Sequence, residues 1–193
     1  MKLIYAVFII LLTLITSAYC QQTAEDWVNK GNTLENQGDY YGAIEAYDEA
    51  IKLDSNFTAA WTSKGKALEI YGDYYRAIPC FEEAIRLNPN DAEAWRTKGS
   101  ALCRNSEFVE SIKANEEAIR LNPRDAEAWR TKGAALGYLN RYDEAVECFN
   151  ETIRLDPDNC DAHRMKGIAL KTLGRTSESD ASFAKAKELG CES

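Results

Sequence analysis

The chain has 193 residues and a mass of 21.7 kDa, with 45% hydrophobic and 28% charged residues, a composition typical of folded globular proteins rather than disordered ones. Its formal net charge is −8 and its pI is near 4.9. This acidity argues against nucleic acid and anionic lipid surfaces as partners, because both bind clustered Lys and Arg side chains.

The first twenty residues form a separate segment. Lys2 precedes an apolar run, Leu3–Ile15, and small and polar residues follow up to Cys20. A basic start, a short apolar segment and small residues are typical of a secretory signal peptide, with cleavage after Cys20. Residues 3–19 are also nearly long enough to cross a bilayer of roughly 30 Å, so retention as a membrane anchor is an alternative, and lipid attachment at Cys20 is a third. Each route predicts that residues 21–193 are extracytoplasmic, either secreted or membrane-tethered.

A period of 34 residues organises the remainder of the chain. The string DAEAWRTKG occurs at Asp91–Gly99 and again at Asp125–Gly133, and columns of Trp, Gly and Leu recur at the same interval. The glycine and leucine columns are unbroken, and His163 replaces Trp in the last unit. The five predicted units span residues 24–57, 58–91, 92–125, 126–159 and 160–193.

Each unit has the pattern of two helices. In the first, Trp61, Gly65 and Leu68 are spaced by four and three residues, which places them on one helical face. Ala77 and Phe81 begin a similar apolar face in the second. Turn-forming residues separate the two helices, and Asn-Pro or Asp-Pro pairs separate the units. Glycine and alanine at the crossing points allow the backbones to approach closely, so we expect an all-α stack in which each unit contacts mainly its neighbours.

This pattern closely resembles the tetratricopeptide repeat (TPR) family. The family's order of Trp, Gly, a large residue, Ala, Phe, Ala and Pro falls on Trp61, Gly65, Leu68, Ala77, Phe81, Ala84 and Pro89. The resemblance covers residues 24–193 and implies a right-handed α-solenoid of five antiparallel helix pairs, with residues 21–193 as one TPR domain. Lysine replaces the family's usual leucine at Lys30, Lys64, Lys98, Lys132 and Lys166. The last unit has a polar second helix, as a terminal capping unit needs.

The resemblance also implies a concave groove, lined by the first helix of each unit, that holds a peptide or helix of a partner protein. One column predicted to face this groove is Val28, Thr62, Arg96, Arg130 and Arg164. The next is Asn32, Lys66, Ser100, Ala134 and Ile168. Lys66 and the arginines form a basic wall suited to an acidic or C-terminal segment. The alternative is a neutralised surface, because Glu93, Glu127 and Asp161 lie three residues before these arginines, at the spacing of intrahelical ion pairs.

The sequence contains no motif for catalysis, a cofactor or a metal ion. The single histidine, His163, occupies the Trp packing column, so we expect a structural role for it. The glycines follow the repeat and form no phosphate-binding loop. We therefore expect no enzyme activity, no cofactor and no nucleic acid, and a protein or peptide as partner.

Two kinds of covalent modification depend on export. Cys160 begins the first helix of the last unit and Cys191 follows its second helix, so antiparallel packing brings both to the same end as a candidate disulfide. The alternative is that both are small surface residues. Sequons for N-glycosylation occur at Asn56 and Asn150, and the predicted mid-helix position of Asn150 favours Asn56.

These features lead to three hypotheses about function. The first is an exported adaptor that docks a peptide or helix in its groove. The second is a structural or assembly component of a cell-envelope complex that uses the same surface with several neighbours. The third is an enzyme, for which the sequence offers no supporting motif.

Overall fold

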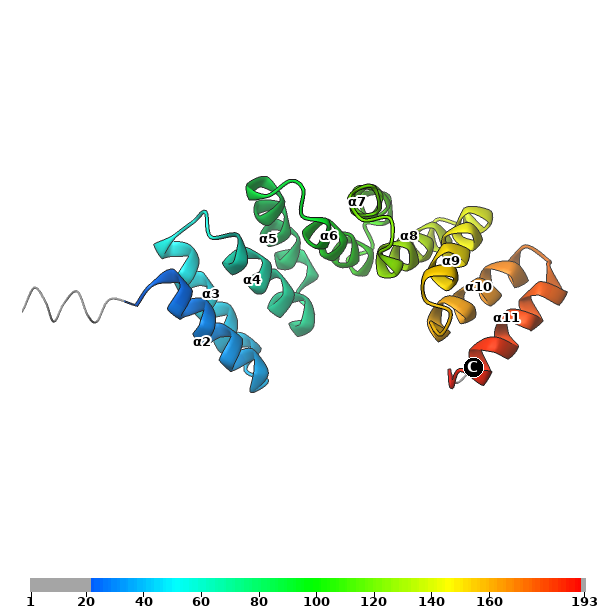
Figure 1. Cartoon of the computed structure of the whole chain (residues 1–193), viewed down its shortest axis with the longest axis horizontal. Helices are drawn as coiled ribbons and strands as arrows, with labels where there is room; N and C mark the ends of the chain where they lie inside the picture. Colours follow the sequence, from blue (N-terminus) through cyan, green and yellow to red (C-terminus); the bar gives the residue numbers. More distant parts are fainter. Residues whose placement is uncertain (1–21, 192–193) are drawn as a thin grey trace, which may run out of the picture.

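The structure of this protein, a computed structural model, describes residues 22–191, which form ten helices and no strand. They follow one another as a row of helix pairs (Figure 1). The pairs are α2 (Ala24–Asn36) with α3 (Tyr40–Leu53), α4 (Thr58–Tyr71) with α5 (Tyr74–Leu87), α6 (Ala92–Arg104) with α7 (Phe108–Leu121), α8 (Ala126–Tyr138) with α9 (Tyr142–Leu155), and α10 (Cys160–Thr172) with α11 (Thr176–Glu188). The predicted all-helical, paired architecture is confirmed. The predicted leader, residues 1–20, lies outside the described residues, and none of the described helices is long and apolar enough to cross a membrane.

Polar caps and left-handed turn residues determine where the helices begin and end. Oδ1 of Asp91 accepts hydrogen bonds from backbone N–H groups at the start of α6, and Asp125 does the same for α8. Each turn within a pair contains one residue with positive φ, namely Gly38, Gly72, Ser106, Asn140 and Gly174. This conformation closes the helix end, and glycine adopts it without steric cost.

The two helices of a pair cross where a glycine faces an aromatic ring. A Cβ on Gly65 would lie only 2.6 Å from Cε1 of Phe81, so no larger residue fits at this position without displacing the ring. Tyr47, Phe149 and Phe183 meet the corresponding glycines in other repeats. The glycine column therefore sets the close spacing between the helices of each pair.

The third repeat along the chain, formed by α6 and α7 and called repeat 3, is the exception, because Asn115 takes the place of the aromatic ring. This side chain is fully buried; its Nδ2 donates to the Ser111 carbonyl oxygen at 2.9 Å, while its Oδ1 has no hydrogen-bond partner among the described residues. Ser111 Oγ donates to the Gly99 carbonyl oxygen at 2.8 Å. An unpaired buried acceptor costs roughly 1–3 kcal/mol. The centre of the array thus combines a missing ring with an unsatisfied polar atom.

Hydrogen bonds from the Trp column attach each first helix to the loop before it. Nε1 of Trp61, Trp95 and Trp129 donates to the carbonyl oxygen six residues earlier, at 2.9, 3.0 and 3.2 Å. Nε2 of His163 lies 3.0 Å from the carbonyl oxygen of Pro157, also six residues earlier. His163 therefore makes the same structural contact as the tryptophans it replaces.

The unusual lysine column connects neighbouring repeats. Each of three lysines pairs with a carboxylate on the second helix of the preceding repeat. The pairs are Lys64–Asp48 at 2.6 Å, Lys98–Glu82 at 3.0 Å and Lys132–Glu116 at 2.8 Å. Each Nζ also lies 5.7–5.8 Å from the ring centroid of the Trp in its own repeat. These lysines are largely covered, so their stems pack and their ammonium groups bridge repeats.

The contacts between repeats give the array its curvature. Each first helix contacts the first helix of the next repeat, from α2 to α10, whereas no two of the described second helices contact one another. The first helices therefore lie on the inner face of the row and the second helices on its outer face (Figure 1).

The last repeat is held by the candidate disulfide. The structure joins Cys160, at the start of α10, to Cys191, beyond α11, with 5.8 Å between their Cα atoms. Cys80, Cys103 and Cys148 are unpaired thiols within the described residues. Burial raises the pKa of the Cys80 and Cys148 thiols to about 11.

Ser106→Gly is expected to increase the free energy of unfolding by about 1 kcal/mol, because glycine avoids the steric cost of a Cβ in the left-handed region. The control is Lys113→Gly in the same repeat, at an exposed position inside α7, which is expected to decrease stability by about 1 kcal/mol. Urea unfolding followed by circular dichroism measures both. A Ser106→Gly variant no more stable than the parent would contradict this account of the turn.

Alkylation with iodoacetamide tests the cysteine assignment on chain produced in an oxidising compartment. At pH 8 the folded protein is expected to react slowly, because Cys80 and Cys148 are buried thiols with raised pKa values. In denaturant without reductant, label is expected at Cys80, Cys103 and Cys148 only, among residues 22–191. Peptide mapping by mass spectrometry reads this out, and label at Cys191 would remove the disulfide.

Candidate functional site

The residues predicted to line the groove belong to the first helices, and several already have partners within the chain. Asn32 Oδ1 accepts a hydrogen bond from the Tyr47 hydroxyl at 2.8 Å. Ser100 Oγ donates to Glu69 Oε1 at 2.7 Å, across the contact between α6 and α4. Ala134 is almost covered and lines a cavity described below.

Two positions differ from the predicted groove. Val28 is only 7% exposed and belongs to the buried cluster that contains Ile44 and Tyr47, so it is part of the core and closed to a partner. The reason is that α2 packs against both α3 and α4, which covers its apolar positions. Thr62 is half-buried, and its hydroxyl donates to the Thr58 carbonyl oxygen at 3.1 Å.

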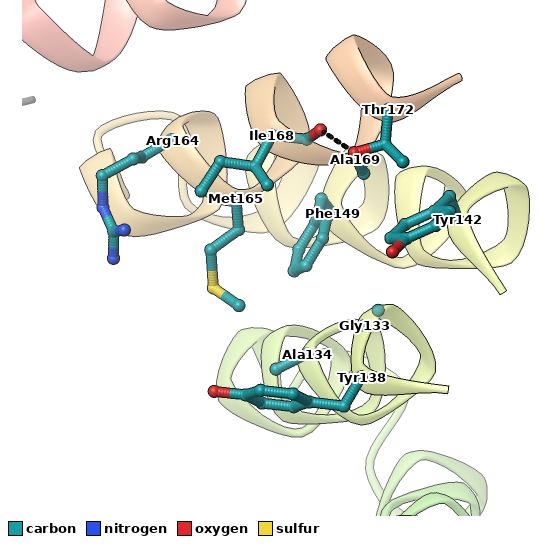
Figure 2. Close-up of a pocket in the computed structure, with 11 residues that line it drawn as sticks. Gly133, Ala134, Tyr138, Tyr142, Phe149, Arg164, Met165, Ile168, Ala169 and Thr172 are labelled. Carbon is teal, nitrogen blue, oxygen red and sulfur yellow. Dashed lines mark hydrogen bonds between the residues drawn. The ribbon is translucent and has the colours of Figure 1, made fainter. Parts of the chain in front are cut away.

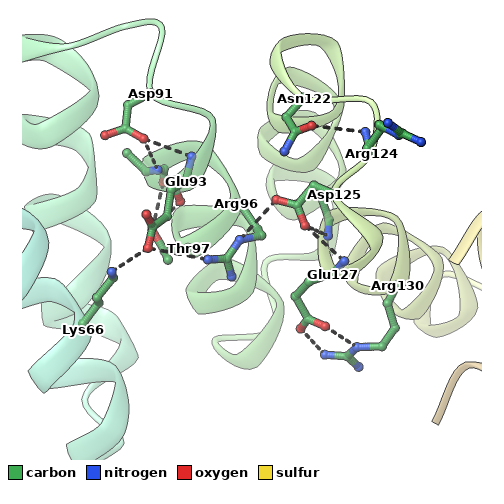
Figure 3. A network of polar contacts seen from close by, with 12 residues as sticks. Lys66, Asp91, Glu93, Arg96, Thr97, Asn122, Arg124, Asp125, Glu127 and Arg130 are labelled. Atoms are coloured by element: carbon green, nitrogen blue, oxygen red, sulfur yellow. Dashed lines mark hydrogen bonds and ion pairs between the residues drawn. The ribbon is translucent and has the colours of Figure 1, made fainter. Parts of the chain in front are cut away.

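The basic wall is neutralised by carboxylates of the chain itself (Figure 3). Lys66 Nζ lies 2.6 Å from Oε1 of Glu93, and this hydrogen bond lowers the pKa of the Glu93 carboxyl group. Arg96 lies between Glu93, at 3.8 Å, and Asp125, the N-cap residue of α8, at 3.3 Å.

The two remaining arginines also pair within the chain. Arg130 Nε donates to Glu127 at 2.8 Å, and its Nη2 donates to the other oxygen of the same carboxylate. Arg164 Nη2 donates to Asp161 Oδ1 at 2.7 Å. The geometry thus realises the intrahelical pairing that the spacing allowed, and the wall carries little unpaired positive charge.

The first helices α8 and α10 leave space between them on the inner face (Figure 2). A cavity of about 370 Å³ lies there, and its lining is mainly apolar. Its lining includes Ala134, Gly137 and Tyr138 of α8, and Arg164, Met165 and Ile168 of α10. Of the predicted groove residues, only Ala134, Arg164 and Ile168 meet at this cavity.

Sequence reasoning missed Gly137, Tyr138 and Met165 as site residues. The sequence did contain one signal for this site, which is a change of residue type at one position of the 34-residue repeat. Positions equivalent to Gly137 carry Glu35, Glu69 and Cys103 in the first three repeats, so a side chain is lost only where the cavity lies. That signal has meaning only once α8 and α10 are known to contact each other.

The two sequons lie in different settings. Asn56 is exposed in the loop between α3 and α4, where an acceptor asparagine is accessible. Asn150 is exposed within α9, but Thr152, the third residue of its sequon, is buried and donates to the Cys148 carbonyl oxygen at 3.0 Å. Asn56 therefore has the better geometry for modification.

The described residues contain no group of three or more His, Cys, Asp or Glu side chains that could hold a metal ion. The cavity lining in Figure 2 includes one positively charged side chain, Arg164, beside aromatic and aliphatic side chains. Such a lining binds and orients a ligand, and it offers no paired nucleophile and base.

Comparison with solved structures identifies MamA as a similar protein. One MamA crystal structure is 30% identical to this chain, with a TM-score of 0.78, and the match covers 82% of this chain and 93% of MamA. MamA from Desulfovibrio magneticus RS-1 is 23% identical, with a TM-score of 0.82, covering 88% of this chain and 96% of that one.

YrrB, described as a TPR protein with an unusual peptide-binding site, is 24% identical with a TM-score of 0.74, and the match covers 86% of each chain. The likeness to the Desulfovibrio protein and to YrrB shows the shared fold. A search of curated proteins finds no match.

Family profiles described as tetratricopeptide repeat match residues 24–57, 58–91 and 126–159, and a further one matches residues 80–113. Together the matches cover more than half of the chain. The paired helices, the glycine–ring crossings and the relatives in solved structures agree with these matches. The chain belongs to the tetratricopeptide repeat family.

Proposed function

We propose that this protein is an exported interaction scaffold that docks a peptide or helix of a partner protein on its inner face. Membership of the TPR family and similarity to MamA support a protein-interaction scaffold in general. YrrB, which shares the fold, is described as having a peptide-binding site. The finer parts, export and docking on the inner face, rest on the arguments that follow.

The observation that carries the docking proposal is the apolar cavity on the inner face. The Lys66, Arg96 and Arg130 charges are already paired within the chain, so long-range attraction of an acidic ligand is weak there. The cavity between α8 and α10, by contrast, presents apolar surface to solvent, including Ile168 and Tyr138. Burial of that apolar surface by a partner would be favourable, at about 25 cal/mol per Å² of apolar area removed from water.

Export is supported by the leader and by the candidate disulfide. Residues 1–20 have the order of a signal peptide, or of an anchor through residues 3–19. A disulfide between Cys160 and Cys191 suits an oxidising, extracytoplasmic compartment.

A second candidate function is an assembly component of a cell-envelope complex. It is favoured by the exposed tyrosines Tyr41, Tyr71, Tyr75 and Tyr138. All four lie at or beside the turns within helix pairs, along one edge of the array. Exposed aromatic side chains are frequent anchors in protein interfaces, so this edge could contact further neighbours.

Docking on the inner face is tested by a matched pair of substitutions. Ile168 on α10 and Val109 on α7 are each 48% exposed, but only Ile168 lines the inner cavity. In a crosslinking pull-down from envelope extract, Ile168→Glu is expected to reduce capture of a specific partner by about tenfold, a change of about 1.4 kcal/mol. Val109→Glu is expected to leave capture unchanged.

The charged wall is tested in the same experiment. The double substitution Arg96→Ala and Arg130→Ala is expected to leave capture within about twofold, because both arginines are already paired. Loss of capture in this variant together with full capture by Ile168→Glu would refute the apolar account.

Export is tested by fractionation and N-terminal sequencing of the native protein. The expected result is an extracytoplasmic chain that either begins at Gln21 or partitions into detergent with its leader intact. A cytoplasmic chain with reduced Cys160 and Cys191 would contradict export.

A further inference from the structure

Gly137 lines the cavity between α8 and α10 and places no side chain in it. At the equivalent position in repeat 2, Glu69 accepts a hydrogen bond from Ser100 of the next repeat at 2.7 Å. In repeat 1, Glu35 accepts one from the Tyr47 hydroxyl at 2.9 Å. Side chains thus occupy this position in the first two repeats, whereas Gly137 leaves it empty.

Neither the backbone nor the packing of α8 requires glycine at position 137. A Cβ there would meet no atom within 4 Å, and φ lies outside the left-handed region. Gly133, one turn earlier, is different, because a Cβ there would lie 2.8 Å from the Phe149 ring. Glycine inside a helix lowers the stability of the helix relative to alanine. The fold therefore does not require glycine at position 137, and a larger side chain there would extend into open space at the cavity.

The size and lining of the cavity suit one large aromatic side chain. Its volume of about 370 Å³ is at the lower end of ligand pockets. Tyr138 and Ile168 stand at its opening, and Met165 points across it toward Ala134 (Figure 2). Thioether sulfur and aromatic rings both make favourable contacts with an aromatic guest.

One wall is fixed before any ligand binds. The Tyr138 ring stacks on Phe108 of α7, with 4.6 Å between the ring centroids and 13° between the planes. Because this contact already restrains the Tyr138 ring, the protein loses less side-chain entropy when a ligand binds.

Arg164 supplies charge complementarity beside the cavity. Arg130 uses two of its nitrogens on Glu127, and Arg96 lies between two carboxylates. Arg164 makes one hydrogen bond, from Nη2 to the exposed Asp161, among the described residues. Its remaining N–H donors can therefore receive a carboxylate of a partner.

We propose that this cavity is the specificity subsite of the inner face and takes an aromatic residue that has an Asp or Glu beside it in a partner polypeptide. The aromatic ring enters between α8 and α10, and the adjacent carboxylate pairs with Arg164. The proposal rests on the proposed docking function and names the chemistry that the partner must carry.

The chain offers a reporter inside the cavity. It has two methionines, Met1 and Met165. Labelling the methionine methyl groups of the whole chain with ¹³C therefore places one probe in the cavity, and Met165→Leu identifies its signal. The probes are the synthetic peptides Ac-GSDWGS-NH2, Ac-GSNWGS-NH2 and Ac-GSDAGS-NH2.

The peptide with Asp and Trp is expected to shift the Met165 methyl signal upfield and saturably, through the ring current of the indole. Replacing Asp by Asn is expected to weaken binding by about three- to tenfold, as a charge-assisted bond becomes a neutral one. The peptide with Ala in place of Trp is expected to give no saturable shift. Equal shifts from the Trp and Ala peptides would overturn the proposal.

Two substitutions of Gly137 separate binding from folding. Gly137→Leu fills the cavity in a helix-compatible way, so it is expected to abolish the shift while Tm stays equal or rises. Gly137→Ala adds only one methyl group and is expected to keep binding within about twofold. Ala134→Leu is the second blocking variant and is expected to abolish binding as well. A folded blocking variant that retains parent affinity for the Asp-Trp peptide would refute the subsite.

Failure of this subsite can be distinguished from failure of the docking function. If Ile168→Glu loses partner capture but Gly137→Leu keeps it, the inner face docks the partner and the aromatic subsite is wrong. If both variants keep capture, docking on this part of the inner face is wrong as well.

Discussion

The contact between a glycine on the first helix and a ring on the second is the constraint on which the rest of this structure depends. A Cβ added to Gly65 would lie only 2.6 Å from the Phe81 ring. The two helices are therefore as close as backbone and side chain permit. This spacing fixes the width of each repeat. Trp–carbonyl hydrogen bonds and lysine–carboxylate pairs recur at equivalent positions along the row.

Repeat 3 shows what happens when that contact is altered. Asn115 keeps the helix spacing but replaces apolar contact with a hydrogen bond to Ser111 and an unpaired oxygen. Two separate apolar clusters both reach into this repeat. Ala101, Leu102 and Ala114 belong to the cluster that contains Val28, and Ile112 belongs to the cluster around Phe149. The boundary between the two clusters therefore falls within repeat 3, where the buried polar side chains of Ser111 and Asn115 lie.

The inner face follows a similar logic in its electrostatics. Repetition of Glu and Arg three residues apart places a carboxylate beside Arg96 and Arg130, so this part of the wall has little charge left for a ligand, whereas Arg164 makes a single hydrogen bond to Asp161. Specific recognition then depends on departures from the period. Gly137 is such a departure, and it lines the cavity between α8 and α10.

The sequence by itself determined the repeat, the helix pairs and the turns, because a 34-residue period with fixed Trp, Gly and Leu columns is a local signal. It also indicated the pairing partners of Arg130 and Arg164, since helical spacing alone brings those side chains together, whereas Arg96 lies closer to Asp125 than to the expected Glu93. Only the tertiary structure decided that Val28 is buried, because its burial depends on α3 and α4 packing over α2. Only the packing of α10 against α8 places Gly137 at a cavity, because Met165 and Ile168 of the next repeat bound it, and contacts between helices some thirty residues apart are not encoded in local periodicity.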